Sequence, residues 1–131
     1  MKLDALVTQG RVPWSPNATA DNLDVWHEYE FPRTGTFTTQ GTVVLFTLAG
    51  GLETQTSVWA YAPLSPDAAE DLTGRTFASV AELRQFVRDV FDGRQVVLAL
   101  ADDLIVSRWS ILEAKGELYE VATSFLEQVL A

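Results

Sequence analysis

Strand-forming residues on both sides of a glycine pair make Gly41–Pro63 the most informative stretch of the chain. Gly50-Gly51 separates two such runs, and paired glycines suit the positive φ angles of a tight hairpin turn. With these two glycines as the loop, Val43 is expected to face Val58 across the hairpin. The pattern therefore predicts a central antiparallel hairpin.

Side chains alternate along strands, so the hairpin has two faces. The bulkier face is expected to pack against helices, and it carries Val44, Phe46, Leu48, Trp59 and Tyr61. The other face is smaller but still apolar, and it carries Val43, Leu45, Thr56, Val58 and Ala60. A sheet face meant only for water would carry more charge. This second apolar face is therefore the main clue to function.

Two further strands are predicted before the central hairpin, at Val25–Phe31 and Gly35–Thr39. A turn through Phe31–Thr34 is expected between them, because proline suits the second position of a turn. Gln40-Gly41 is expected to form the tight turn that leads into the hairpin. Together these segments predict a four-stranded meander, preceded by an irregular N-terminal arm over residues 1–24.

After the hairpin the apolar period changes to that of helices. Ser65 with a proline in the first turn predicts a short helix that ends near Gly74. Ser79 and Glu82 form a capping box that begins a second helix, whose apolar stripe is Val80, Leu83, Phe86, Val87, Val90 and Phe91. A last helix is predicted from Glu117.

A second hairpin is predicted between these helices, with strands at Val96–Ala101 and Leu104–Ile111 and Asp102-Asp103 as its loop. Its bulkier face is expected to carry Val96, Leu98, Leu100, Ile105 and Trp109. Its smaller face is expected to carry Val97, Ala99, Leu104, Val106 and Arg108. The fold class is therefore α+β: an antiparallel sheet of about six strands, a meander plus a hairpin, with two to three helices packed on one face. The 131 residues fit one domain, 1–131.

Charge favours some partners over others. Eighteen acidic residues against nine basic ones give a formal charge of −9, which repels phosphate backbones and disfavours nucleic acid. An acidic surface would speed the encounter with a basic protein. Solubility alone is the other explanation for this charge.

The chain has no cysteine, so disulfides, thiolate metal sites and cysteine nucleophiles are excluded. No stretch approaches the ~20 apolar residues of a membrane span, and the first residues do not have the apolar run of a signal peptide. A cytoplasmic location and no membrane partner are therefore expected.

The search for chemistry predicts no catalytic, cofactor-binding or metal-binding residue, and no cofactor. His27 is the only histidine, and it lies in a predicted strand without a serine motif that would suit a triad. Asp102-Asp103 alone supplies too few oxygens for calcium. Glu28 and Glu30 share one strand face, where acids also protect a sheet edge from aggregation.

Three hypotheses of function remain. The first is a non-enzymatic acidic protein-interaction domain, such as an inhibitor or immunity-type protein that binds a basic protein. The second is a small-molecule-binding protein or enzyme with a pocket between sheet and helices, for which the candidate lining residues are Trp26, Tyr29, Trp59, Tyr61 and Trp109. The third is a self-associating structural subunit, such as a homodimer.

The first hypothesis depends on a patch formed by the smaller faces of the two hairpins, which would be unusually apolar for the bare surface of a monomer. The predicted partner-binding residues are Val43, Leu45, Val58, Ala60, Val97, Val106 and Arg108, and Ala99 belongs to the same patch. The N-terminal arm, a second copy of the chain or a different protein can each cover it.

The order of strands, helix, hairpin and helix is similar in outline to small acidic secretion-chaperone-like domains. It also resembles bacterial toxin-neutralising immunity proteins. Neither resemblance involves a sequence motif, so neither implies a site residue.

Overall fold

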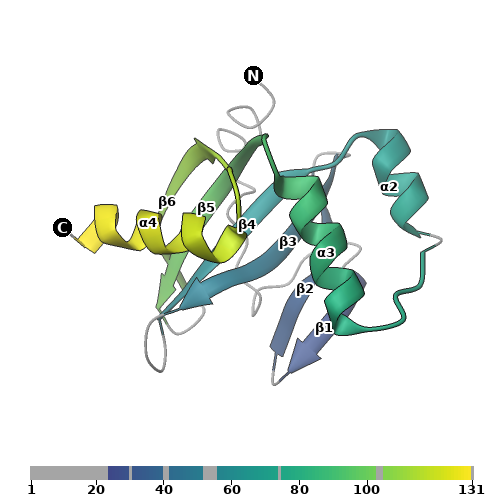
Figure 1. Ribbon diagram of the computed structural model, residues 1–131, viewed down its shortest axis with the longest axis horizontal. Coiled ribbons are helices and arrows are strands. Elements are labelled where there is room, and N and C mark those ends of the chain that lie inside the picture. Colours follow the sequence, from purple (N-terminus) through teal and green to yellow (C-terminus); the bar gives the residue numbers. More distant parts are fainter. Residues whose placement is uncertain are drawn as a thin grey trace.

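The computed structural model describes most of the chain from Asp24 onward, namely residues 24–29, 31–39, 42–51, 56–73, 75–102 and 105–130. Six antiparallel strands form one sheet in which neighbours in sequence are neighbours in space. The strands are β1 (Asp24–Tyr29), β2 (Phe31–Thr39), β3 (Thr42–Gly51), β4 (Thr56–Pro63), β5 (Gln95–Asp102) and β6 (Ile105–Glu113). The helices in the described part are α2 (Pro66–Thr73), α3 (Val80–Phe91) and α4 (Leu118–Leu130). Their apolar side chains join one core on one face of the sheet (Figure 1), which confirms the predicted α+β fold.

Short-range signals begin and end the helices where the sequence predicts. The Ser65 hydroxyl accepts a hydrogen bond from the amide of Ala68 at 3.2 Å. The Ser79 hydroxyl accepts one from the amide of Glu82 at 3.1 Å. Each cap therefore binds a first-turn amide that has no acceptor within the helix. Gly93, with φ of 74°, follows α3 in the left-handed region that glycine adopts without strain. None of the described helices is long and apolar enough to cross a membrane.

The glycine pair does not form the turn of the central hairpin, so that prediction is wrong. Strand β3 continues through Gly51, and Val58 pairs with Gly50 instead of Val43. The connection between β3 and β4 lies outside the described residues. Gly50 lies under α4, where a Cβ built on it would be 3.3 Å from the Cβ of Ala122. Glycine serves here to let the helix approach the strand closely.

The faces of this hairpin are as predicted, but the choice of core face is wrong. Phe46 pairs with Tyr61 and Leu48 pairs with Trp59, so the bulky residues still share one face. The helices cover the opposite, smaller face, to which Leu45, Val58 and Ala60 belong.

The pairing of β4 with β5 explains why the helices choose the smaller face. Trp59 lies opposite Ala99 and Ala60 lies opposite Leu98, so large and small side chains alternate across the two strands. The helices bring bulk of their own, and their buried residues are Leu72, Leu83, Val87, Phe91, Ala122, Phe125 and Leu126. Because protein interiors are close-packed, this bulk fits over a strand that presents alanines.

A β-bulge in β6 changes which side chains of the second hairpin share a face. Near the turn, Ala101 pairs with Val106, but the next pair is Leu100 with Arg108. The extra residue in β6 is Ser107, and a one-residue shift moves every later side chain to the other face. Trp109 therefore lies opposite Ala99, on the face away from the helices, and its predicted placement beside Leu98 and Leu100 is wrong.

The first strand ends earlier than predicted, at Tyr29, and the second begins earlier, at Phe31. Tyr29 pairs with Phe31, so the predicted turn through Phe31–Thr34 is wrong and those residues belong to β2. Thr39 pairs with Thr42, and the turn predicted at residues 40–41 lies outside the described residues. The predictions on the arm before Asp24, and on the side chains of His27, Glu28 and Glu30, lie outside what the structure describes.

Aromatic rings pack on the sheet face opposite the helices. The Phe37 ring centroid lies 6.2 Å from that of Phe46 and 6.4 Å from that of Tyr61, and the Phe46 and Trp59 centroids are 6.3 Å apart. Phe46, Trp59 and Tyr61 are fully buried. Burial raises the pKa of Tyr61 far above its usual range, so its hydroxyl stays protonated. The sheet therefore carries a buried apolar cluster on each face.

The contact between Gly50 and α4 can be tested by substitution. Gly50→Val is expected to destabilise the protein by about 1–3 kcal/mol, because the new methyl groups overlap the Ala122 side chain. In an Ala122→Gly background the same substitution is expected to cost less, with a coupling energy of about 1 kcal/mol. Urea unfolding of the four variants measures this coupling. Equal costs in both backgrounds would show that α4 does not set the requirement for glycine.

Candidate functional site

The predicted partner-binding residues do not form one patch. Val43, Leu45, Val58 and Ala60 belong to the core beneath the helices. Val97, Ala99 and Val106 belong to the aromatic cluster on the opposite face. Val58, Ala60 and Val97 have no exposed surface at all. The premise of one exposed apolar patch is therefore wrong. The pairing of β4 with β5 places Ala99 opposite Trp59 and Leu98 opposite Ala60, so the smaller faces of the two hairpins lie on opposite sides of the sheet.

Arg108 has a structural contact of its own. It pairs with Leu100 in the sheet, and its Nη1 donates a hydrogen bond to the backbone carbonyl of Val129 at 2.6 Å. A cation at the C-terminal end of a helix can bind a carbonyl that has no hydrogen-bond donor within the helix, and it complements the helix dipole. The arginine thus joins β6 to the end of α4.

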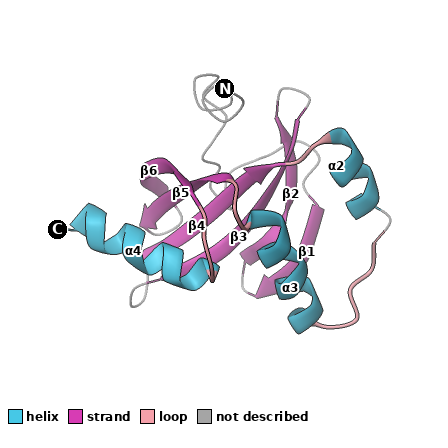
Figure 2. Cartoon of the chain, turned by 45° about the horizontal axis from the view of Figure 1, so that its top comes forward, coloured by secondary structure: helices cyan, strands magenta, loops and turns pink. Residues whose placement is uncertain are grey.

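The structure instead brings other residues together, around a cavity of about 350 Å³ between α3, the start of α4 and strands β2 and β3. The lining residues come from segments that are far apart in the sequence. They are Thr34, Thr47, Leu48, Ala49, Ala81, Leu83, Arg84, Gln85, Val87, Arg88, Glu117, Leu118 and Tyr119. Figure 2 shows α3 and α4 on the same side of the sheet, with the N-terminal end of α4 near α3.

Two threonines on neighbouring strands give this cavity a polar side. Thr34 pairs with Thr47 across β2 and β3, and their hydroxyl oxygens are 2.9 Å apart. Both residues are buried, at 6% and 7% exposure. Two hydroxyls carry two protons, and their mutual hydrogen bond uses one of them. The second proton has no acceptor among the described residues and is available to a molecule in the cavity.

Charged side chains from α3 and the start of α4 line the rest of the cavity. Arg88 Nη1 lies 2.5 Å from Glu117 Oε1, in an ion pair whose side chains are half-exposed. Arg84 lies one helical turn before Arg88 and also lines the cavity. No carboxylate among the described residues pairs with Arg84. Tyr119, in the first turn of α4, lines the same space and is 68% exposed.

This cavity also lies between sheet and helices, but its described lining residues are not those of the pocket in the second hypothesis. Trp59 and Tyr61 lie on the opposite face of the sheet. One sequence signal for the observed site is the threonine at alternate positions of β2, at residues 34, 36 and 38. These positions face the same side as the apolar residue Leu45. Short polar residues at positions expected to be core indicate a gap or a site.

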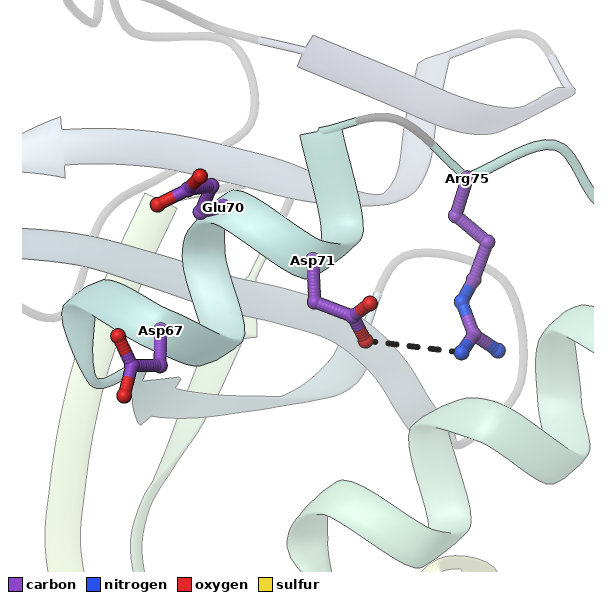
Figure 3. A pocket seen from close by; sticks show the side chains of 4 residues that line it. All are labelled: Asp67, Glu70, Asp71 and Arg75. Carbon is purple, nitrogen blue, oxygen red and sulfur yellow. Dashed lines mark ion pairs between the residues drawn. The ribbon is translucent and has the colours of Figure 1, made fainter.

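A second, open hollow lies beside α2. Its lining residues are Asp67, Glu70, Asp71 and Arg75 (Figure 3). Arg75 Nη2 lies 3.6 Å from Asp71 Oδ2, and the Arg75 guanidinium also lies over the Phe86 ring at 4.9 Å. Among the described residues there is no group of three or more side chains that could hold a metal ion. The hollow is therefore an acidic surface feature.

Comparison of the whole chain with protein-family models, with curated proteins and with solved structures finds no match. The resemblances in outline to secretion-chaperone-like domains and immunity proteins therefore remain expectations. What this site does has to be argued from its residues.

The threonine pair gives a specific expectation for stability. Thr34→Val leaves the Thr47 hydroxyl without its partner in a buried site, at a cost of about 1–3 kcal/mol. The double variant Thr34→Val/Thr47→Val removes both polar groups and keeps their shape, so it is expected to be less destabilised than the two single variants added together. Denaturant unfolding measures the difference. Strictly additive costs would show that water already satisfies both hydroxyls.

Proposed function

We propose that the protein is a binding domain, and that the cavity between α3 and α4 holds a small organic molecule with a carbonyl or carboxylate group. The observation that supports this proposal most directly is the buried threonine pair, which has one hydroxyl proton left to donate. A carbonyl or carboxylate oxygen is the acceptor such a proton requires.

The size and composition of the cavity support an organic ligand. Its volume of about 350 Å³ lies within the range of ligand sites, which are mostly apolar with a few placed polar groups. Leu83 and Val87 of α3 supply buried apolar surface, and Leu118 adds to it from α4. A ligand with a hydrocarbon body and one polar end matches this division.

Arg84 favours a carboxylate as that polar end. The neighbouring cation, Arg88, is already paired with Glu117, whereas Arg84 has no ion-pair partner among the described residues. A guanidinium can bind a carboxylate through two parallel hydrogen bonds. The cavity therefore offers a cation and a hydroxyl donor to the same ligand.

Benzoate and benzamide test this proposal, because they share a ring and differ in charge. Titration followed by amide NMR signals is expected to move the signals of Thr47, Arg84 and Tyr119, with a Kd on the order of 1 mM for benzoate. Thr34→Val/Thr47→Val is expected to weaken both compounds. Arg84→Gln is expected to weaken benzoate about tenfold and benzamide much less.

Matched variants separate the site from general effects. Thr36→Val changes a buried threonine of the same strand that does not line the cavity, and it is expected to leave binding unchanged. Arg75→Gln removes the same charge from outside the cavity, so it is also expected to be neutral. If neither compound moves signals around the cavity at about 10 mM, the proposal is wrong.

The first hypothesis, an acidic domain that binds a basic protein, is supported by a separate observation. Most described cations already have partners within the chain: Arg88 and Lys115 pair with carboxylates, and Arg94 donates to the Pro63 carbonyl at 2.7 Å. Asp67 and Glu70 on α2 are exposed and have no ion-pair partner among the described residues. The surface charge is thus available to a basic partner.

Decalysine is a suitable probe for this second candidate. Asp67→Asn/Glu70→Gln/Asp71→Asn is expected to weaken binding at least about fivefold more than Glu82→Gln/Asp89→Asn/Glu127→Gln, which changes the net charge equally. Calorimetry at about 50 mM and about 200 mM salt should also show weaker binding at the higher concentration. Equal losses for both triple variants would leave the charge of α2 as a contribution to solubility alone.

A further inference from the structure

Strand β6 is one edge of the sheet. The strand order runs from β1 to β6, so β6 pairs with β5 on one side, and no strand in the described part pairs with its other side. It is nine residues long. An edge of this length presents a row of backbone amides and carbonyls to which another strand can add.

The part of β6 beyond its bulge has little of the usual protection of an exposed edge. Proteins blunt edges with proline, lysine, inward charges or bulges, and residues 105–112 contain no proline, lysine or acid. The one charge, Arg108, is directed to the end of α4. The bulge lies at Ser107, and the pairing is regular from Arg108 to Glu113. By contrast, the other edge strand, β1, has two irregularities in its register.

An exposed aromatic side chain lies on this edge. Trp109 is 43% exposed and faces away from the helices, opposite Ala99. Val106 and Ile111 on the same face are partly buried against the aromatic cluster. The apolar surface of that cluster therefore continues to the edge of the sheet and ends in a tryptophan.

Helix α4 extends beyond this edge. In Figures 1 and 2 its C-terminal end projects past β6, the last strand beneath it. The hydrogen bond from Arg108 to Val129, in the last turn, fixes the helix over the strand. A further strand added beside β6 would lie below the projecting end of the helix.

We propose that two copies of this chain pair through β6 in antiparallel fashion and form one continuous sheet. Charge makes this edge the place where a second copy can approach. Each copy has a formal charge of −9 and repels the other over most of its surface, but residues 105–112 of β6 contain no acid. The two edges can therefore meet without placing like charges opposite each other.

Symmetry fixes the arrangement. A two-fold axis perpendicular to the sheet, through Ser110, keeps both helical layers on one side. Ser110 then lies opposite Ser110 of the second copy, and Trp109 lies opposite Ile111 of the second copy. This register buries the exposed tryptophan against an aliphatic side chain, a favourable cross-strand pair. Each projecting α4 then covers the β6 strand of the other copy.

The absence of cysteine allows a direct test of this register. Directly opposite residues of an antiparallel pair have Cα atoms about 4.5–5.5 Å apart, within the range that a disulfide spans. Ser110→Cys is therefore expected to form a covalent dimer under mild oxidation. Ser124→Cys, an equally conservative change at an exposed position of α4, is expected to form no covalent dimer and to run as a single chain on the same denaturing gel without reductant.

Mass in solution tests the interface independently. Size-exclusion chromatography with light scattering at about 100 µM is expected to give twice the chain mass of 14.5 kDa. Trp109→Lys is expected to give the single-chain mass with an unchanged circular dichroism spectrum. Val80→Lys replaces an apolar residue of almost equal exposure, 44%, on α3 and is expected to remain a dimer.

Three results would overturn the proposal. They are a single-chain mass for the unmodified protein, a dimer that persists in Trp109→Lys, and equal cross-linking of Ser110→Cys and Ser124→Cys. None of these results bears on the cavity between α3 and α4, because the dimer does not involve its lining residues.

Discussion

The pairing of large with small side chains across β4 and β5 is the constraint on which the rest of the fold depends. Trp59 lies opposite Ala99, and Ala60 lies opposite Leu98. One face of the sheet therefore gathers aromatic rings, and the other presents alanines between leucines. Helices that carry leucine, valine and phenylalanine fit the second face, because a close-packed core has room for only one set of bulky side chains at each position.

The cavity lies where the aliphatic packing between sheet and helices stops. On β3–β5 the residues beneath the helices are aliphatic, but at the junction of β2 with β3 they are Thr34 and Thr47. Short hydroxyl side chains do not fill the space between α3 and α4 as leucines would. Threonine at these positions, in place of a larger aliphatic residue, thus provides both the space and its hydrogen-bonding group. The packing of the sheet is in this way linked to the proposed ligand.

The distribution of acidic residues distinguishes the edge strand β6 from the helical side of the protein. Most acids of the described residues lie on the helices and their connections, while residues 105–112 of the edge strand contain none. Arg108 connects these regions, since it belongs to the edge strand and binds the last turn of α4. The helical layer and the edge strand are therefore joined by this hydrogen bond.

The sequence by itself determined the α+β fold, the helix starts at Ser65 and Ser79, and the residues that share each face of the first hairpin, because capping and alternation are local properties. Only the tertiary structure decided which face the helices cover, why Gly50 is a glycine and where Ser107 bulges. These features depend on contacts between segments far apart in the chain, such as Gly50 with Ala122. The candidate site has the same origin: Thr34, Arg84 and Glu117 are distant in sequence, and only the packing of α3 and α4 on the sheet brings them to one cavity.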